Sequence, residues 1–304
     1  MRKPASEEHI FFVDSGDFLK WWLEEPRLDG DALDIFRRYY SNYEGRFAGY
    51  LESAWTDRHQ ELERAIEGLR GRQHARVMDL GCGTGSVALY MAWKLKGDGE
   101  VLGVDIRDDR LFCARERQKV LEGASGFDLN CRFLNSNVLC LEDDRGFDFI
   151  SLEEAFHHME PRLEVVKKIS ALLKKRGVLI ISEVNACNPL MQVRLFLKRG
   201  FRTVVKRTGE DGVTHVYGNE RILRAGRTAE HFRPYNMQVE SLRYFRIFGA
   251  SIARWMSRAG LPVLDIEERL CKLAFFARIF SVHYNIVLQK PINSFEMISR
   301  KLRL

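Results

Sequence analysis

RVMDLGCGTG, residues 76–85, joins a short apolar run to three closely spaced glycines, Gly81, Gly83 and Gly85. The apolar residues predict a buried strand over 77–80, and the residues after the glycines predict a helix that ends near Leu95. Glycine allows a tight strand-to-helix turn and lets a ligand approach the backbone closely. The following helix offers N–H groups without intrahelical partners and the positive end of its dipole. The stretch therefore predicts a ligand-binding turn.

The segments after this turn alternate between short apolar runs and helical patterns. We expect helices from about Asp108 to Glu122 or Gly123 and from about Pro161 to Lys175. Strands are expected over 101–105, 131–134, 147–152 and 177–183. This alternation is typical of βαβ units and a parallel sheet. It predicts a doubly wound, Rossmann-like α/β fold, in which ligands bind beyond the carboxyl ends of the strands.

Residues 239–248 and 282–289 are expected to be the last two strands, an antiparallel edge hairpin with a helical insertion, which completes a seven-stranded sheet. We expect an N-terminal helical cap (1–70), a ligand-binding core (71–185), a substrate-cover insertion after the fifth strand (186–238), the last strands (239–290) and a basic amphipathic tail (291–304). The insertion is longer than a simple connection, and such segments are usually functional or disordered.

The first 70 residues have apolar side chains at helical spacing over 16–23, 31–40 and 51–69. The segment is rich in aromatic residues, which favours core packing, with a pocket lining as the alternative. The aromatic residues are Phe18, Trp21, Trp22, Phe36, Tyr39, Tyr40, Tyr43, Phe47, Tyr50 and Trp55.

Composition excludes several classes of protein. At 304 residues and 45% hydrophobic content, the chain is too apolar to be disordered, yet it has no run of about 18 uncharged apolar residues that would span a bilayer. The first nine residues contain no apolar segment, so we expect no secretory signal. The six cysteines form no CxxC pair, which argues against a zinc site and against a disulfide framework. We expect a cytoplasmic protein without a metal.

The charge is concentrated in the C-terminal part of the chain. Residues 185–304 contain 21 Lys and Arg against 9 Asp and Glu, whereas the net charge of the whole chain is +6. A solvated face, an anionic substrate and a membrane surface are all compatible with this excess. The basic amphipathic tail at 292–304 and the apolar segment at 270–280 could contact the inner membrane surface peripherally. Docking on the sheet or on a partner subunit is the alternative, and the sequence leaves the oligomeric state open.

The spacing of the glycines limits the identity of the ligand. A dinucleotide fingerprint requires GxGxxG, whereas this chain has GxGxG with Ser86 in the sixth position, and the lysine of a mononucleotide P-loop is missing. Asp105 lies 20 residues after Gly85, at the end of the second expected strand, where a carboxylate can accept hydrogen bonds from both ribose hydroxyls. These residues predict an adenosine-containing ligand without a pyrophosphate.

Four motifs in order carry a resemblance to a known family. DLGCGTG (79–85) resembles the first motif of class I S-adenosylmethionine-dependent methyltransferases, and Asp105 matches the acidic ribose-binding residue of their second motif. FDFISLEEAFHHM (147–159) and LLKKRGVLIISE (172–183) resemble the segments around the fourth and fifth strands of small-molecule members. The resemblance covers about residues 75–185. It implies S-adenosyl-L-methionine as cofactor, bound by Asp79, Gly81, Cys82, Gly83, Gly85, Asp105, Ile106, Asn137, Val138 and Glu153.

Two departures from the family pattern stand out. Asn137 lies where an acidic residue near the adenine is common, although an amide oxygen can still accept a hydrogen bond from the adenine amino group. The usual Pro-Gly-Gly turn before the fifth strand is Lys-Arg-Gly at 175–177, which affects the turn more than the function.

Methyl transfer is an in-line displacement, so alignment of the acceptor with the methyl carbon should supply most of the rate, and a base would add to it. Glu153, Glu154, His157 and His158 follow the fourth strand. If the chain turns helical after Leu152, positions 153 and 157 share one face. We therefore expect Glu153 and His157, with His158, to act in catalysis.

The acceptor is expected to be a small molecule, anionic or lipid-linked, that accepts the methyl group on oxygen. Its candidate binding residues are Glu183 and Asn185 after the fifth strand and His231, Arg233 and Tyr235 in the cover insertion. A non-catalytic S-adenosylmethionine-binding protein is an alternative. A nucleic-acid methyltransferase is disfavoured, because SLEEA (151–155) lacks the motif of base-modifying members and no nucleic-acid-binding module is recognisable.

Overall fold

The computed structural model describes residues 10–24, 27–40, 48–72, 74–208 and 214–291. The expected tail from residue 292 onward and the aromatic residues Tyr43 and Phe47 lie outside the described residues. Among the described residues, no helix combines the length and the apolar character needed to cross a bilayer.

A seven-stranded sheet forms the centre of the molecule, with the strand order β3-β2-β1-β4-β5-β9-β8. The first five strands are parallel, whereas β9 is antiparallel to both β5 and β8. This confirms the predicted doubly wound, Rossmann-like sheet and its antiparallel edge hairpin. The strands are β1 (Ala75–Leu80), β2 (Gly99–Asp105), β3 (Cys131–Asn135), β4 (Phe147–Glu153), β5 (Leu173–Val184), β8 (Gln238–Phe245) and β9 (His283–Gln289).

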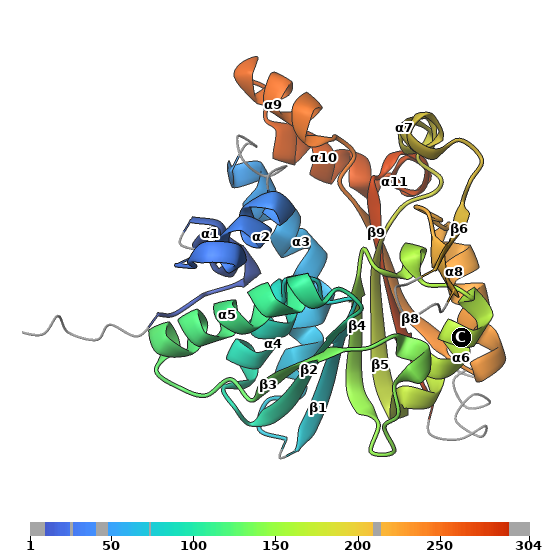
Figure 1. Ribbon diagram of the computed structural model, residues 1–304. Coiled ribbons are helices and arrows are strands. Elements are labelled where there is room, and N and C mark those ends of the chain that lie inside the picture. The colour runs from blue at the N-terminus through green and yellow to red at the C-terminus, as the bar shows by residue number, and fades with distance from the viewer. Residues whose placement is uncertain (1–9, 25–26, 41–47, 73, 209–213, 292–304) are drawn as a thin grey trace, which may run out of the picture.

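Helices cover both faces of the sheet, as Figure 1 shows. The N-terminal helices and the two helices after β1 and β2 pack on one face, and α6 and α8 pack on the other. The helices of the first face are α1 (Ser15–Glu24), α2 (Gly30–Tyr40), α3 (Ala48–Glu67), α4 (Ser86–Leu95) and α5 (Asp108–Ser125), and those of the second are α6 (Arg162–Leu172) and α8 (Ala225–Phe232).

The two faces have separate hydrophobic cores, because successive side chains of a strand point to opposite faces. In β1, Val77 belongs to the core under α1–α5, whereas Met78 and Leu80 belong to the core under α6 and α8. All three side chains are buried, as expected for a strand covered on both faces. The strands have continuous apolar runs in the sequence because both of their faces are buried.

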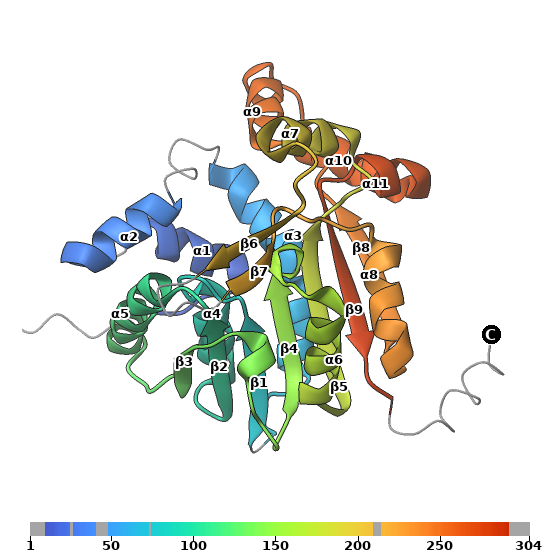
Figure 2. The same ribbon diagram turned by 45° about the vertical axis from the view of Figure 1, so that its right-hand side comes forward.

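The remaining elements gather at the end of the sheet where the parallel strands terminate (Figure 2). They include a two-stranded antiparallel hairpin, β6–β7, that the sequence analysis did not predict. The elements are α7 (Pro189–Arg199), β6 (Val204–Thr208), β7 (Thr214–Gly218), α9 (Ala250–Arg258), α10 (Val263–Lys272) and α11 (Ala274–Phe280). Their position places them beside the edge at which ligands bind in this fold.

Two local expectations were wrong. The helix expected to reach Lys175 ends at Leu172, and β5 begins at Leu173, where Arg176 turns the chain with φ 64°. The chain also does not become helical after Leu152: β4 continues through Glu153, Glu154 has φ 47°, and only a single 3-10 turn follows at Phe156–His158. The expected pairing of positions 153 and 157 on one helical face is therefore lost.

Candidate functional site

The glycine turn after β1 has the backbone conformation that the sequence predicts. Gly81, Gly83 and Gly85 have φ values of 81°, 54° and 85°, which side-chain-bearing residues rarely adopt. A Cβ atom on Gly81 would lie 2.4 Å from the Cβ of Ala155, which follows β4. Neither the conformation nor the space at this turn accepts a side chain.

Asp105 lies at the carboxyl end of β2, directly beside the glycine turn. Its two carboxylate oxygens accept hydrogen bonds from the backbone N–H groups of Gly83 and Arg107, each at 2.9 Å. These bonds fix the carboxylate at the rim of the turn, where its remaining lone pairs can accept hydrogen bonds from a ligand's hydroxyl groups. The geometry agrees with the predicted ribose contact.

The buried side chain of Asp79 indicates what charge a bound ligand would carry. Its side chain is 2% exposed, and among the described residues its Oδ2 atom has no hydrogen-bond partner. Burial, with a smaller effect of the Glu153 charge, raises the pKa of Asp79 well above its usual value. A buried polar atom without a partner is costly, so this site favours a ligand that brings a positive charge or a hydrogen-bond donor. An amino-acid-bearing nucleoside with a sulfonium meets that requirement.

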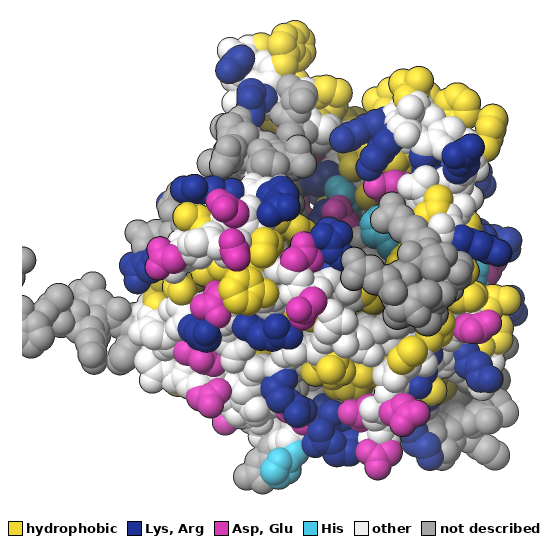
Figure 3. Space-filling model, in the orientation of Figure 1, with side chains coloured by type: hydrophobic (Ala, Val, Ile, Leu, Met, Phe, Trp, Pro, Cys, Tyr) yellow, Lys and Arg dark blue, Asp and Glu magenta, His cyan; other side chains and the backbone are white. Residues whose placement is uncertain are grey.

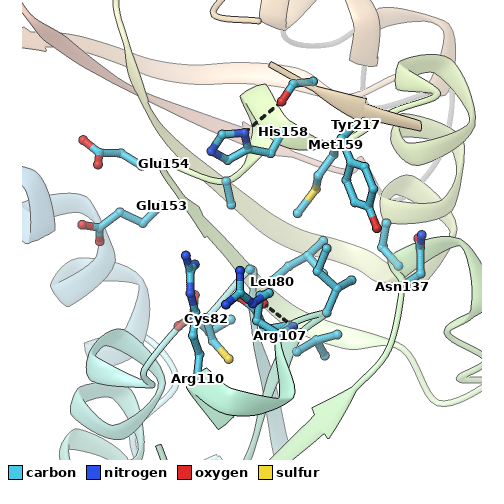
Figure 4. A pocket seen from close by; sticks show the side chains of 18 of the residues that line it. Leu80, Cys82, Arg107, Arg110, Asn137, Glu153, Glu154, His158, Met159 and Tyr217 are labelled. Carbon is cyan, nitrogen blue, oxygen red and sulfur yellow. Dashed lines mark hydrogen bonds between the residues drawn. The ribbon is translucent and has the colours of Figure 1, made fainter. Parts of the chain in front are cut away.

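A cavity of about 1380 Å³ joins these groups (Figure 4). Asp79, Gly81, Cys82 and Asp105 line one part of it, and Glu153, His158 and Glu220 line another. The cavity therefore places all the predicted cofactor residues except Gly83 and Gly85, and one of the predicted catalytic histidines, around a single space. The described residues contain no group of three or more His, Cys, Asp or Glu that could hold a metal ion.

Ile106, Asn137 and Val138 line the same cavity where an adenine is expected. The Asn137 side-chain oxygen accepts the N–H of Leu139 at 3.0 Å and caps the 3-10 turn η1 (Val138–Cys140). That oxygen keeps a second lone pair, so a contact with an adenine amino group stays a prediction. Ile106 is 46% exposed, so it offers apolar surface to a ring.

The N-terminal helices close one side of the cavity. Arg58 of α3 donates to Glu153 at 2.6 Å and to Glu154 at 2.9 Å, and His59 lies 2.7 Å from the other Glu153 oxygen. Burial alone would raise the pKa of Glu153, but the charges of Arg58 and His59 outweigh it and lower the pKa to about 2. Glu153 is thus an anion fixed at the cavity wall, and its low pKa makes it a weak base at neutral pH.

The same helical segment contacts the glycine turn itself. The Tyr40 hydroxyl lies 2.9 Å from Thr84 Oγ1 and accepts a hydrogen bond from Trp22 Nε1 at 2.9 Å. Tyr39, Tyr40 and Trp55 line the cavity, whereas Phe18 and Trp22 are fully buried in the core. Both interpretations of the aromatic segment hold, because Tyr40 and Trp55 line the cavity and are also part of the buried core.

His157 is buried behind the cavity wall. Its Nδ1 lies 2.7 Å from Glu183 Oε2, and its backbone N–H donates to the other Glu183 oxygen at 3.2 Å. Burial opposes protonation, but the Glu183 carboxylate overcomes it and raises the pKa of His157 above its usual value. The residues described as lining the cavity include neither His157 nor Glu183. Both predicted residues form an internal ion pair below the cavity.

His158 faces the cavity instead (Figure 4). Its Nδ1 lies 3.0 Å from the carbonyl oxygen of Gly218, and because a carbonyl only accepts, Nδ1 donates and Nε2 keeps its lone pair. Partial burial, with the neighbouring His157 charge, lowers the pKa of His158. The side chain is therefore neutral at neutral pH and able to accept a proton through Nε2.

The unpredicted β6–β7 hairpin covers this part of the cavity. Val205, Val216 and Tyr217 line the cavity, and Tyr217 forms a β-bridge with Met159. A Cβ atom on Gly218 would lie 2.1 Å from the His157 carbonyl oxygen, so the hairpin approaches the turn after β4 as closely as backbone allows. Figure 4 shows Met159 and Tyr217 side by side opposite Cys82 and Arg110.

The other predicted substrate residues lie elsewhere. Asn185 is buried and donates to the carbonyl oxygens of Arg278 and Ser281, which fixes the end of α11. His231, Arg233 and Tyr235 belong to α8 and the following 3-10 turn, and none is among the described residues that line the cavity. The physical reason is that α8 buries Ala225, Thr228 and Phe232 against the sheet rather than covering the strand ends.

Sequence reasoning missed the charged residues that reach the cavity from other elements. Arg58 comes from α3, Arg107 directly precedes α5, and Arg110 lies in its first turn. Arg110 stacks over Tyr39 at 5.0 Å. Arg107 and Arg110 follow shortly after Asp105 in the sequence, so their position after a strand end could have indicated that they reach the cavity. No local pattern indicates this for Arg58.

The fold and the cavity together define a doubly wound α/β domain whose cavity suits an adenosine-containing ligand. Residues 72–216 match the family model "Methyltransferase domain". A putative sarcosine dimethylglycine methyltransferase from Galdieria sulphuraria has a similar fold, with a TM-score of 0.55 and 16% identity, and covers 85% of this chain and 99% of that chain. Residues 72–216 therefore match a methyltransferase domain, and the fold is that of the class I, S-adenosylmethionine-dependent enzymes.

Two curated relatives match part of this domain. A ubiquinone biosynthesis O-methyltransferase from Actinobacillus pleuropneumoniae is 29% identical over 130 residues, which is 41% of this chain and 50% of the relative. A demethylmenaquinone methyltransferase from Bacillus subtilis is 25% identical over 166 residues, 53% of this chain and 65% of the relative. The chain spans about half to two thirds of the length of these relatives. S-adenosylmethionine is the cofactor of the family, and it meets the requirement set by Asp79.

Proposed function

We propose that this chain is a methyltransferase that moves the methyl group of S-adenosylmethionine to an oxygen atom of a small molecule, with His158 as the general base. One observation carries the proposal: a single cavity joins the glycine turn and Asp105 to the Nε2 side of His158. The names of the two relatives support it, because both describe methyltransferases of quinone metabolism and one specifies oxygen.

The chemistry is a displacement in which the acceptor oxygen bonds to the methyl carbon as the carbon–sulfur bond breaks and its electron pair stays on sulfur. Asp105 and the glycine turn hold the nucleoside, and Asp79 lies where a positive group compensates its burial. The hydroxyl proton passes to His158 Nε2, whose tautomer is set by the Gly218 carbonyl. Met159 and Tyr217, which the β-bridge holds side by side, would contact the acceptor.

The lowered pKa of His158 determines the expected pH profile. Since its pKa lies below the usual histidine value, the neutral form predominates at neutral pH, and the rate should fall as the pH decreases through that pKa. Protonated His157 cannot serve in this role, because Glu183 raises its pKa and occupies its Nδ1 side. We assign His157 and Glu183 a positioning role under the turn that carries His158.

The test is formation of S-adenosylhomocysteine from a panel of hydroxylated aromatic acceptors and a metabolite extract. His158→Gln should slow turnover by a factor of about 10² to 10⁴, the usual contribution of a general base, with unchanged cofactor affinity. His231→Gln, which lies outside the cavity lining, is the matched control and should turn over at the wild-type rate. Full activity of His158→Gln would remove the base assignment. Tight cofactor binding without any product would favour a non-catalytic binding protein.

A further inference from the structure

The exposed side of α7 is apolar, which reverses the usual pattern of a helix on a soluble protein. Leu190, Val193 and Leu197 are 67%, 59% and 80% exposed, and Phe201 just beyond the helix is 89% exposed. Of the residues of α7, only Leu195 is buried, on the opposite side of the helix. Large exposed apolar groups at such a spacing mark an interaction surface.

A second helix presents the same kind of side chains at the same end of the molecule. Ile252 and Trp255 of α9 are 44% and 67% exposed. Figures 1 and 2 both place α7 and α9 beyond the carboxyl ends of the parallel strands, and Figure 3 shows hydrophobic side chains over the tips of both helices. We call the exposed apolar residues of α7 and α9, with Phe201, the apical surface.

The segments that carry the apical surface are basic, whereas the neighbouring helix α10 exposes Asp265 and Glu268. From residue 184 to residue 209 the sequence contains six Lys and Arg and no Asp or Glu, and from 241 to 264 it again contains no acidic residue. Arg194 and Arg202 are exposed beside the α7 stripe, and Arg258 ends α9. In Figure 3 dark blue basic side chains adjoin the hydrophobic ones at both helices.

We propose that the apical surface docks on an anionic lipid bilayer. Apolar side chains, including Trp and Phe, interleaved with Lys and Arg are the combination that inserts at the interface of a membrane while the cations contact its anionic headgroups. The apolar groups sit on two separate helix tips with a hollow between them rather than on one flat face (Figure 3), which suits shallow insertion at two points. A partner protein or a second copy would instead need a continuous complementary face.

The position of the apical surface relates it to the cavity. α7 leads directly into β6, and the β6–β7 hairpin lines the cavity through Val205 and Tyr217. His and acidic side chains are visible in the hollow between the two helix tips in Figure 3. Docking would therefore bring the mouth of the cavity toward the bilayer, and an acceptor dissolved in the lipid could enter from it. The entry of an acceptor from the lipid rests on the proposed function, whereas the docking itself does not depend on that function.

The test is flotation of the full chain with vesicles of phosphatidylcholine alone and of phosphatidylcholine mixed with phosphatidylglycerol. Wild-type protein should float with the anionic vesicles. Arg194→Gln with Arg202→Gln should lower partitioning into anionic vesicles about fivefold per charge, and Leu190→Ser with Leu197→Ser about tenfold per leucine. The matched control is Leu163→Ser with Lys167→Gln on α6, two exposed residues on the flank of the sheet, and it should float like the wild type.

Three results would overturn the proposal. They are wild-type protein that stays in solution, an equal loss of flotation in the α6 control, and an arginine variant that binds anionic vesicles as well as the wild type does. A second copy as the occupant would appear in sedimentation as a dimer that Leu190→Ser with Leu197→Ser dissociates, without flotation. Asp105→Ala should float normally while losing cofactor, so that a failure of docking and a failure of the proposed methyl transfer can be told apart.

Discussion

Gly81→Ala tests whether the turn after β1 depends on the absence of a side chain. Two separate effects act at this position. The φ of 81° disfavours any L-residue with a Cβ, and the new Cβ would lie 2.4 Å from the Cβ of Ala155. Gly71 offers the matched control, because its φ of 72° is similar and a Cβ there would meet nothing within 4 Å.

The two effects have different magnitudes. A left-handed conformation costs an ordinary residue about 1–2 kcal/mol, so Gly71→Ala should lower the free energy of unfolding by about that amount. Overpacking a rigid site costs about 1–3 kcal/mol more, which makes the total for Gly81→Ala about 2–5 kcal/mol. Ala155 follows Glu154, which itself has a positive φ of 47°, so the turn has little freedom to move away.

Urea unfolding of the wild type and both variants measures these differences, and calorimetric titration with S-adenosylhomocysteine measures the effect on the site. Gly81→Ala should be the less stable variant and should bind the ligand more weakly, because the turn lines the cavity. Gly71→Ala should bind like the wild type. Equal stabilities of the two variants, or normal ligand binding by Gly81→Ala, would refute the steric argument.

Three further predictions concern the walls of the cavity. Asp105→Ala should weaken S-adenosylhomocysteine binding by about 3–6 kcal/mol, the value of two hydrogen bonds to a charged group, and calorimetry should detect little binding. Because the pKa of Glu153 is lowered from 4.5 to about 2, the stability that Glu153 contributes is present above pH 4.5 and is lost as the pH falls toward 2. In urea unfolding, the difference between the wild type and Glu153→Gln should therefore shrink over that range. Gly218→Ala should displace β7 from the His157 carbonyl and raise the KM for the acceptor more than it changes cofactor affinity.

The central sheet and the cofactor half of the cavity could be predicted from the sequence because local patterns encode them. Val77 and its neighbours form a continuous apolar run because β1 is buried on both faces. The three closely spaced glycines indicate a turn with positive φ values. Asp105 follows β2 directly, so its place at the strand end is fixed by the position of the strand. Each of these signals lies within a few residues of the feature that it reports.

The acceptor half depends on contacts between distant parts of the chain. Arg58 meets Glu153 across 95 positions, and Gly218 meets His158 across 60. The β6–β7 hairpin contacts the turn after β4 through the Met159–Tyr217 bridge and the Gly218 carbonyl. Its two strands of five residues lie in a basic segment without clear alternation. No local pattern specifies such pairings.

The choice between the two histidines shows how a single backbone feature decides a site. A helix after Leu152 would have placed His157 beside Glu153. Instead Glu154 adopts φ 47° and the chain makes one 3-10 turn, which directs His157 inward to Glu183 and His158 toward the cavity. Sequence periodicity could not anticipate this, because the break occurs at a residue that ordinarily favours neither turn nor positive φ.

The most direct measurement of the central claim is a crystal structure of the protein with S-adenosylhomocysteine. The account predicts the nucleoside against the turn at Gly81–Gly85, both ribose hydroxyls on Asp105, the amino group near Asp79 and the sulfur directed toward the space between His158 and Tyr217. A ligand bound elsewhere, or one in the cavity whose sulfur points away from His158 while Asp105 makes no ribose contact, would contradict it.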